Sequence, residues 1–221
     1  EDGIRDRDVT GVQTCALPIF ALFEPNFHSG ILAHKQDAVK KLFEKCIKFP
    51  YKHFVKDWGH LYAPVLKNDN TTTLFFEHDG LGRDLNSSVS VAFEFRSGTL
   101  NVLHVSEAAF VTNDRLAASV QTVPDTGEVL YESTPNGRGG DFFEQWQNWK
   151  KLGTLAPYRG FFFPWFRNYP EDRTEARWRL PPGAELTDAE RELRQLYKLD
   201  DVALAWRRYA VAALCQGDVD T

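Results

Sequence analysis

The stretch that most constrains how this chain can fold is a short apolar run, 101–105, that ends abruptly on Ser106 and Glu107. A second run, 128–132, ends in the same way on the polar segment 133–137. A helical pattern lies between the two runs, as it does between neighbouring strands of a parallel α/β sheet. Such sheets bind ligands in the crevice beyond the carboxyl ends of their strands. The sequence therefore predicts a site where these two strands end.

The composition limits the size of the core and excludes some classes of protein. With 221 residues, 43% apolar and 14% aromatic, the chain can bury one substantial core, or one core and a small appendage. The net charge of −5 argues against a wholly basic nucleic-acid-coating protein but leaves room for local patches. No apolar run is long enough to cross a bilayer, so we expect no membrane partner. Three isolated cysteines without metal-ligand spacing point to a reducing compartment.

The first segment, 1–19, has neither helical nor strand periodicity and resembles the translation of a sequencing adapter. We expect this segment to be non-native and to lie outside the fold. An ordinary N-terminal strand and loop is the alternative. Methionine is absent, including at position 1, so we expect the chain to be a piece of a longer reading frame.

From residue 20 onward the periodicity is that of an α/β domain. The predicted strands are 27–34, 72–76, 89–95, 100–105, 128–133 and 158–163. An amphipathic helix follows the first strand, with its apolar face at Val39, Leu42, Phe43 and Cys46. The turn at 96–99 places Arg96 near the predicted site, although an arginine in a turn is also an ordinary surface residue.

Two further patterns have more than one interpretation. The lysines between positions 35 and 56 could track a phosphate backbone, but a solvated helix face without a partner is the preferred explanation. The aromatic residues at helical spacing within 141–151 are interpreted as a packed face rather than as a base-stacking platform.

Two more helices with recognisable starts are predicted. Asn113 or Asp114 is the expected cap of the helix between the two central strands. After a proline-rich connection at 168–182, Thr187 and Glu190 have the spacing of a capping box, and helices are expected at 187–197 and 200–214.

A carboxylate at a buried strand end can polarise a water for attack on a phosphoryl group, and a neighbouring hydroxyl can bond a water of a bound magnesium ion. Short polar side chains at the next strand tip can sense the γ-phosphate and couple its loss to movement. A hydroxyl–carboxylate pair in another kind of hydrolase is the alternative. Acyl transfer is discounted, because the sequence has neither a Gly-x-Ser-x-Gly elbow nor a plausible Ser, His and Asp set.

The same residues resemble a known family. Leu-His-Val-Ser-Glu-Ala-Ala-Phe at 103–110, Glu-Ser-Thr-Pro-Asn-Gly at 132–137 and Phe-Phe-Glu-Gln-Trp at 142–146 are similar to motifs of the large terminase subunit of tailed bacteriophages. Shorter matches are Ile-Leu-Ala-His at 31–34, Phe-Phe-Pro-Trp at 162–165 and the segment 199–208. The resemblance extends from about residue 20 to the end of the chain, and the combination is more specific than any one piece.

The resemblance implies a P-loop NTPase fold of the RecA/ASCE type, with a mostly parallel sheet flanked by helices and a C-terminal helical extension. It divides the chain into a truncated ATPase core, 20–166, and a linker with a helical subdomain, 167–221, that leads to a missing nuclease domain. The implied function is that of the ATP-hydrolysing motor that drives viral DNA into procapsids. A helicase-like P-loop ATPase and a noncatalytic binding or assembly module are the alternatives.

Residue roles follow by position in the matched motifs. Glu107 is the implied Walker B carboxylate that orients the attacking water, and Ser106 stands where many members have a magnesium-holding Asp. Arg96 is the implied arginine finger that acts on a neighbouring subunit. The implied coupling motif, which also contacts the nucleotide, consists of Ser133, Thr134 and Asn136.

The resemblance also implies ligands, partners and a location. The cofactors would be ATP and Mg²⁺, and the partners would be double-stranded DNA, the portal or procapsid, the small terminase subunit and further copies in a homo-oligomeric ring. The location would be the cytoplasm of the bacterial host. No Gly-x-x-x-x-Gly-Lys-Ser/Thr motif, the loop that cradles phosphates, occurs in the sequence. We therefore expect the parent protein, and not this chain by itself, to hydrolyse ATP.

Overall fold

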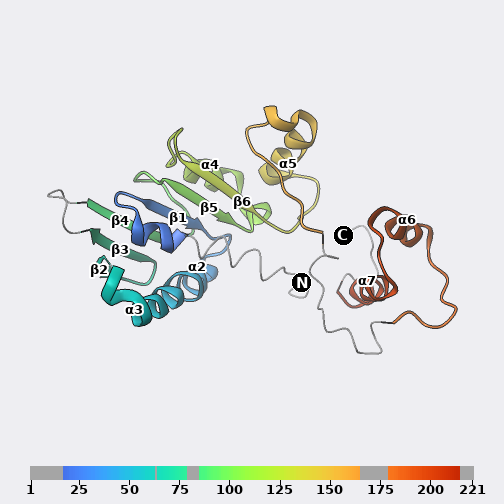
Figure 1. Ribbon diagram of the computed structural model, residues 1–221. Helices are drawn as coiled ribbons and strands as arrows, with labels where there is room; N and C mark the ends of the chain where they lie inside the picture. The colour runs from blue at the N-terminus through green and yellow to red at the C-terminus, as the bar shows by residue number, and fades with distance from the viewer. Residues whose placement is uncertain (1–16, 63, 79–84, 165–178, 215–221) are drawn as a thin grey trace. The chain divides into compact units, whose positions relative to one another are not determined.

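The computed structural model describes residues 17–62, 64–78, 85–164 and 179–214 (Figure 1). They fall into two compact units, one within 7–160 and one within 161–221. Most of the adapter-like segment and the expected boundary at 166/167 lie outside the described residues. The expected boundary at 19/20 falls inside a helical segment, 17–23, in which Leu17 is 3% exposed and belongs to a core cluster.

The larger unit contains a six-stranded sheet in the order β2-β3-β4-β1-β5-β6 (Figure 1). Its strands are β1 His28–Leu32, β2 Val65–Asp69, β3 Thr73–His78, β4 Leu85–Ala92, β5 Val102–Ser106 and β6 Glu128–Glu132. β4, β1, β5 and β6 are mutually parallel, and β2 and β3 add an antiparallel extension. The sheet is therefore mixed but mostly parallel, as predicted, although β2 and the antiparallel pairing had no clear sequence signal.

One face of the sheet is covered by a long, nearly continuous helix after β1. It consists of α2 Gln36–Leu42, the π-helical η1 Phe43–Lys48 and α3 Phe49–Tyr62. Its buried side chains Val39, Phe43 and Ile47 recur every four residues. A π-helical turn has more residues than an α-helical one, so this spacing keeps the three on one side. They pack with Ile31, Val89 and the 17–23 segment.

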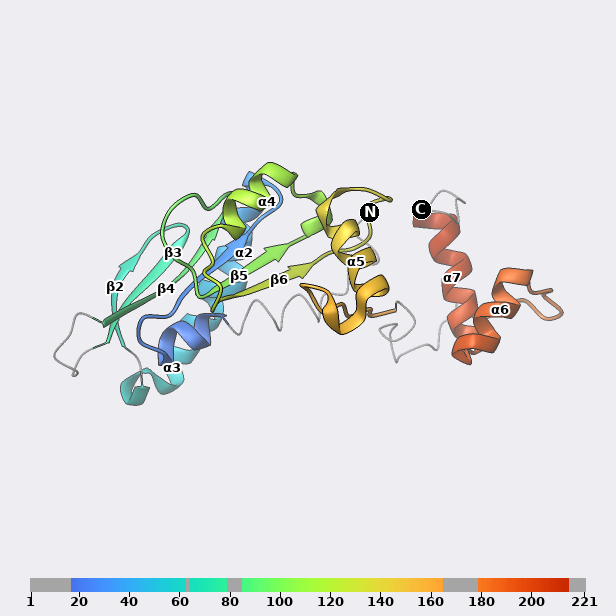
Figure 2. The ribbon, with the colours of Figure 1, turned by 90° about the horizontal axis from the view of Figure 1, so that it is seen from above.

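The opposite face is covered by α4 Asn113–Val120, which connects β5 to β6 (Figure 2). Leu116 of α4 packs against Leu103 and Val105, while His104 lies between them in the strand. Because side chains alternate along a strand, β5 contributes apolar residues to both faces. Consecutive strands joined through a helix are thereby placed side by side, with their carboxyl ends at one edge.

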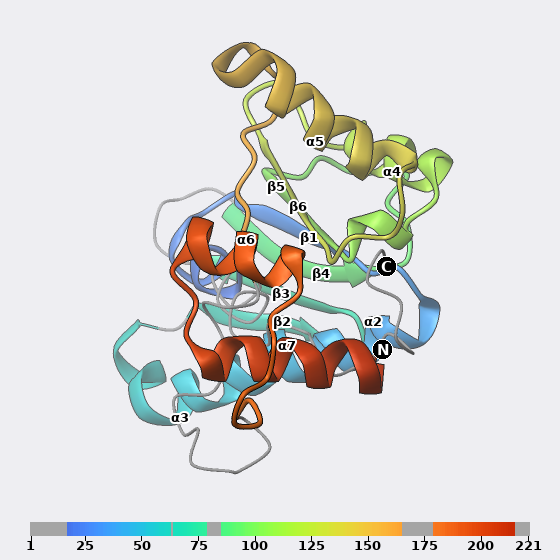
Figure 3. The same ribbon diagram turned by 90° about the vertical axis from the view of Figure 1, so that its right-hand side faces the viewer.

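The last helix of this unit is α5 Gly140–Leu152, at the β6 end of the sheet (Figures 1 and 3). Its aromatic stripe is only partly packed. Phe142 contacts the core beneath α4, and Trp146 and Trp149 contact each other with ring centroids 5.1 Å apart. No α5 side chain is fully buried. The predicted packed face is thus a half-buried one.

Three sequence predictions about elements are wrong. No strand forms at 158–163, where Phe161, Phe162 and Phe163 are 65%, 67% and 56% exposed. A strand needs a hydrogen-bonded neighbour, and among the described residues β6 is the last strand at that edge. The strand predicted at 89–95 spans 85–92. The N-cap of α4 is Thr112, and its side chain makes no capping bond.

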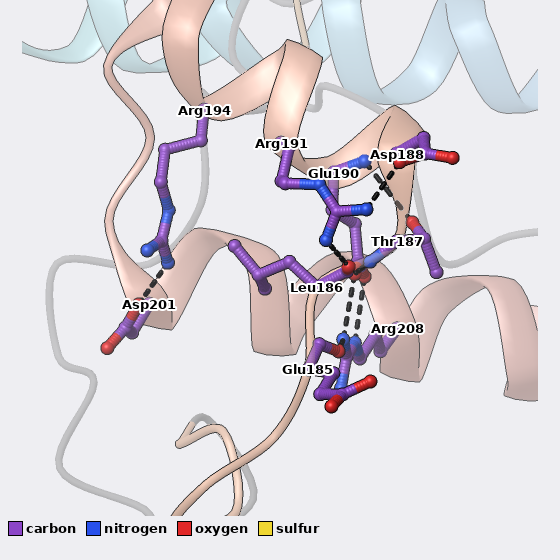
Figure 4. Close-up of polar contacts among 9 residues, drawn as sticks. All are labelled: Glu185, Leu186, Thr187, Asp188, Glu190, Arg191, Arg194, Asp201 and Arg208. Carbon is purple, nitrogen blue, oxygen red and sulfur yellow. Dashed lines mark hydrogen bonds and ion pairs between the residues drawn. The ribbon is translucent and has the colours of Figure 1, made fainter.

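The smaller unit is a pair of helices, α6 Asp188–Tyr197 and α7 Asp201–Leu214, as the sequence predicts. The predicted capping box is present, with the Glu190 N–H donating to Thr187 Oγ1 at 3.2 Å and the Thr187 N–H donating to Glu190 Oε2 at 2.9 Å (Figure 4). Arg208 of α7 donates from Nε and a terminal nitrogen to the same carboxylate, each at 2.7 Å. Glu190 is 2% exposed, and Arg208 lowers its pKa to about 2. One carboxylate therefore starts α6 and joins it to α7.

No helix among the described residues combines the length and the apolar character that a membrane span needs.

Candidate functional site

The predicted site residues meet at the carboxyl edge of the parallel strands. Ser106, the last residue of β5, is the register partner of Glu132, the last residue of β6. Glu107 and Ser133 therefore leave the sheet side by side, as the sequence predicts. The pattern of two polar strand ends was sufficient to anticipate this meeting, because parallel neighbours end at the same edge.

Glu107 has a left-handed backbone, with φ 56° and ψ 50°. A non-glycine residue in this region costs about 1–3 kcal/mol and persists only where surrounding structure requires it. Here the carbonyl oxygen of Glu107 accepts from the Phe110 N–H at 2.9 Å, which begins the 3-10 turn η2 Ala108–Phe110. The sharp turn leaves the half-buried Glu107 side chain at the end of the strand.

Polar contacts bind the segment after β6 to this turn. Thr134 Oγ1 donates to Glu107 Oε2 at 3.4 Å, a long bond. Ser133 Oγ accepts from the Ala109 N–H at 3.1 Å and donates to the Thr134 carbonyl at 2.8 Å. Asn136 Nδ2 donates to the Ala109 carbonyl at 3.1 Å. Three side chains of one segment thus contact either Glu107 or the turn that it begins.

The residues at this edge fit a magnesium ion that is held together with a nucleotide. Mg²⁺ is usually bound by one or two carboxylates, while substrate phosphates and waters complete its octahedron. Glu107 provides a carboxylate, whereas the neighbouring Ser106 is 4% exposed and offers a neutral hydroxyl. Among the described residues there is no group of three or more His, Cys, Asp or Glu side chains that could hold a metal alone. A metal here would need the phosphates of its nucleotide.

Arg96 lies at the same edge but in a different position from the Glu107 group. It follows β4, which is separated from β5 by β1. Its Nε is 2.9 Å from Glu94 Oε2, and this hydrogen bond raises the pKa of the guanidinium. The side chain is 75% exposed. The four other predicted residues around Glu107 come from β5, β6 and the segments that follow them.

Arg115 of α4 is a residue that the sequence pattern did not single out. Its guanidinium donates to the carbonyls of Ala33 at 2.9 Å, Phe93 at 3.2 Å and His34 at 3.4 Å. It also lies 3.3 Å from the centre of the Phe93 ring. These carbonyls directly follow β1 and β4, so Arg115 ties two strand ends at the edge that carries Glu107. An arginine on a polar helix face gives no sequence sign of such a role.

A second unanticipated pair lies just behind the site. His104 of β5 is fully buried, and its Nε2 is 3.3 Å from Glu132 Oε2 of β6. Glu132 immediately precedes Ser133, so this contact joins the two strands one residue before the polar segment. A histidine inside an apolar strand looks like an ordinary core residue, and its cross-strand partner depends on register.

The sheet, its order and its helices define the class of fold: a mostly parallel α/β sheet with helices on both faces and polar residues at its carboxyl edge. No family model and no curated protein matches the sequence. Among solved structures, a mutant of the large terminase ATPase domain of Thermus phage P74-26 matches with a TM-score of 0.52 and 18% identity, over 72% of this chain and 64% of that one. The resemblance to large terminases is thus confirmed at the level of the fold.

The large terminase of the thermophilic bacteriophage D6E is a second similar structure. It matches with a TM-score of 0.44 and 14% identity, and the match covers 68% of this chain and 34% of that one. The D6E protein has also been solved in complex with ADP and with ATP-γ-S. This chain therefore spans about a third of the D6E protein and somewhat under two thirds of the P74-26 domain.

Proposed function

We propose that this chain is the central part of the ATPase domain of a large terminase subunit, whose parent hydrolyses ATP to drive viral DNA into procapsids. The observation that carries the proposal is the contact between Thr134 Oγ1 and Glu107 Oε2 at 3.4 Å, within a sheet that has the terminase ATPase fold. A carboxylate at one strand end, bonded to a hydroxyl at the next, is the connection that a motor needs between hydrolysis and movement.

Glu107 is the proposed catalytic carboxylate, which accepts a hydrogen bond from water and aligns it for attack on the terminal phosphate. Bound ATP and Mg²⁺ would supply the reacting phosphoryl group and neutralise its charge. The left-handed backbone supports this role, because it turns the chain away from the strand end and leaves the carboxylate at the edge. Ser106 would contact a metal-bound water through its hydroxyl.

Ser133, Thr134 and Asn136 are the proposed coupling residues. Each has a hydrogen bond to the Glu107 turn or within its own segment that another acceptor or donor could replace. A terminal phosphate near Glu107 would compete for the Thr134 hydroxyl. After hydrolysis and loss of that phosphate, the Thr134 hydroxyl would bond Glu107 again, and the segment after β6 would shift. Hydrolysis would thereby be coupled to a movement of this segment.

Arg96 is the proposed finger, acting on the nucleotide of a neighbouring subunit in a homo-oligomeric ring. The proposed finger role is supported by the exposure of the Arg96 side chain, which is 75% exposed at the carboxyl edge of the sheet. Its contact with Glu94 would have to be exchanged for the phosphate. The finger role is specific to a ring, so Arg96→Ala would affect turnover only under conditions in which subunits assemble.

DNA, the portal or procapsid and the small terminase subunit are the proposed partners, in the cytoplasm of a bacterial host. The support for DNA is the row of exposed lysines on α2, η1 and α3. Nuclease activity would belong to a further domain of the parent protein. Because the sequence has no Gly-x-x-x-x-Gly-Lys-Ser/Thr loop, we expect this chain alone to have no ATPase activity.

The test is a Glu107→Gln substitution in a full-length terminase that contains this sequence. We expect ATP turnover to fall at least about 100-fold, because the amide cannot accept the proton of the attacking water, while nucleotide binding is unchanged. Glu128→Gln, at the opposite end of β6, is the matched control and should retain wild-type turnover. Undiminished hydrolysis in Glu107→Gln would remove Glu107 from the mechanism.

A titration of the purified chain with an ATP analogue distinguishes the motor from a binding or assembly module. Saturable, magnesium-dependent binding that Glu107→Gln retains would support an ATPase core. Complete lack of binding, together with undiminished turnover of the full-length Glu107→Gln protein, would favour the module.

A further inference from the structure

A pocket that is lined by none of the predicted site residues lies between α4, β6 and α5, elements that Figure 3 shows close together at one end of the sheet. Its volume is about 220 Å³. Aliphatic side chains of α4 line one side, including Leu116 and Val120. The rest of the lining is aromatic and polar: Asn113, Tyr131, Asp141, Gln145 and Tyr158. An apolar hollow with a few convergent polar groups is the usual form of a small-ligand site.

The aromatic part of the lining is a pair of tyrosines. The rings of Tyr131 and Tyr158 have centroids 4.9 Å apart and planes inclined by 30°, and their hydroxyl oxygens are 3.4 Å apart. Burial, followed by the hydrogen bond to Tyr158, raises the pKa of Tyr131. The two stacked rings present electron-rich faces, which favour a flat cation.

The polar part of the lining contains two hydrogen-bond acceptors that have no donor among the described residues. Gln145 Nε2 donates to Asp141 Oδ1 at 3.3 Å, which fixes the orientation of the amide, since only its nitrogen can donate to a carboxylate. The other two oxygens, Asp141 Oδ2 and Gln145 Oε1, are buried and have no hydrogen-bond partner among the described residues. Buried acceptors of this kind are costly unless a donor reaches them.

We propose that this pocket binds a guanidinium group. Asp141 and Gln145 are four residues apart on α5, so their free oxygens lie one helical turn apart on the same face. A guanidinium is planar, carries several N–H donors in a rigid fork and stacks on aromatic rings. It meets both acceptors and the tyrosine surface together, whereas an ammonium is a compact charge without a face to stack. The volume suits such a group with some water, but not a drug-sized ligand.

The guanidinium could belong to a small free molecule or to an arginine side chain of a peptide. Calorimetric titration of the complete chain separates these sources with three probes: methylguanidinium, N-acetyl-arginine amide and a tetrapeptide with a central arginine. N-acetyl-citrulline amide, which has the same shape without the charge, is the reference. We expect saturable binding of every guanidinium probe at least about tenfold tighter than citrulline. Tighter binding of the tetrapeptide than of methylguanidinium would identify a peptide arginine as the source.

Asp141→Asn is the main variant, because it keeps the shape of the side chain and removes its charge. We expect it to weaken guanidinium binding at least about tenfold. Glu144→Gln, an exposed position on the same helix, is the matched control and should bind as the wild type does. Tyr158→Leu removes one ring and should weaken the arginine probe more than an ammonium probe, which gives a second readout if Asp141→Asn is poorly folded.

Two results would overturn the proposal. One is the absence of saturable guanidinium binding by the wild-type chain, and the other is equal binding by wild type and a folded Asp141→Asn chain. Neither result depends on ATP or on Glu107, so the test is independent of the proposed ATPase function.

Discussion

At the scale of single residues, the two decisive features are the backbone of Glu107 and the bonds of Arg115. Glu107 is held in a region of φ and ψ that favours glycine, at the point where the chain leaves β5. Arg115 donates hydrogen bonds to the main-chain carbonyls of Phe93 and Ala33, which follow β4 and β1. Both residues shape the edge of the sheet, and each can be tested by its effect on stability.

Replacement of Glu107 separates backbone strain from side-chain contacts. Glu107→Gly and Glu107→Ala both remove the carboxylate and its bond to Thr134, but only alanine keeps a Cβ in the left-handed region. We expect the glycine variant to be more stable than the alanine variant by about 1 kcal/mol in urea unfolding followed by circular dichroism. Equal stability of the two variants would show that this backbone conformation is not retained in solution.

Loss of the Arg115 guanidinium should destabilise the larger unit. Arg115→Ala leaves the carbonyls of Ala33 and Phe93 without their donors, at a cost of about 2 kcal/mol in the free energy of unfolding. Arg138→Ala, an exposed arginine in the loop before α5, should change stability by less than about 0.5 kcal/mol. The measurement is again urea unfolding, and similar small effects for both variants would contradict the structural role of Arg115.

At the scale of elements, the smaller unit depends on one carboxylate. Glu190 caps α6 and receives two bonds from Arg208 of α7 (Figure 4). Leu193, Leu199 and Leu204 belong to the small apolar core of this unit. Arg194 and Asp201 add an ion pair at the other end of the helices. So few apolar residues make the polar network a large part of what keeps α6 against α7.

Acid should therefore loosen the helix pair. The pKa of Glu190 is about 2 in the folded protein, against an ordinary value of 4.5 for the unfolded chain. The ionised Glu190 therefore stabilises the folded helix pair fully above about pH 4.5, and this contribution is lost as the pH falls toward 2. Because Arg208 is 34% exposed, we expect on the order of 2 kcal/mol rather than the full linkage value. Helicity of the unit, followed by circular dichroism from pH 6 to pH 2, should drop in this range. Glu190→Gln should be less stable at pH 6 and nearly insensitive to pH between 4.5 and 2.

At the scale of the whole molecule, charge is strongly segregated. Residues 35–56 contain seven lysines and two acidic residues, a balance of +5, whereas the whole chain carries −5 and the remainder therefore −10. Six of the lysines are exposed, and Lys48 pairs with Asp69 at 2.7 Å. A basic helix surface on an acidic protein favours one orientation toward a polyanion such as DNA.

Duplex binding should depend on these lysines. We expect Lys41→Gln with Lys45→Gln, and separately Lys52→Gln with Lys56→Gln, to weaken binding of a labelled DNA duplex and to reduce the slope of log K against log salt by about 1–2. The control is Lys150→Gln with Lys151→Gln on α5, which removes the same charge from another exposed helix. Fluorescence anisotropy across a salt series measures the slopes. If all three double variants have the same slope, the lysines of α2, η1 and α3 form an ordinary solvated helix face with no DNA-binding role.

The sequence alone determined the parts of this protein whose causes are local. Apolar spacing predicted the helix after β1, polar strand ends located Glu107 and Ser133, and a hydroxyl and a carboxylate three residues apart predicted the start of α6. Tertiary structure decided what depends on neighbours distant in the chain. The carbonyl partners of Arg115, the contact of His104 with Glu132 and the absence of a strand at 158–163 each follow from which segments lie side by side, and local periodicity contains no information about that pairing.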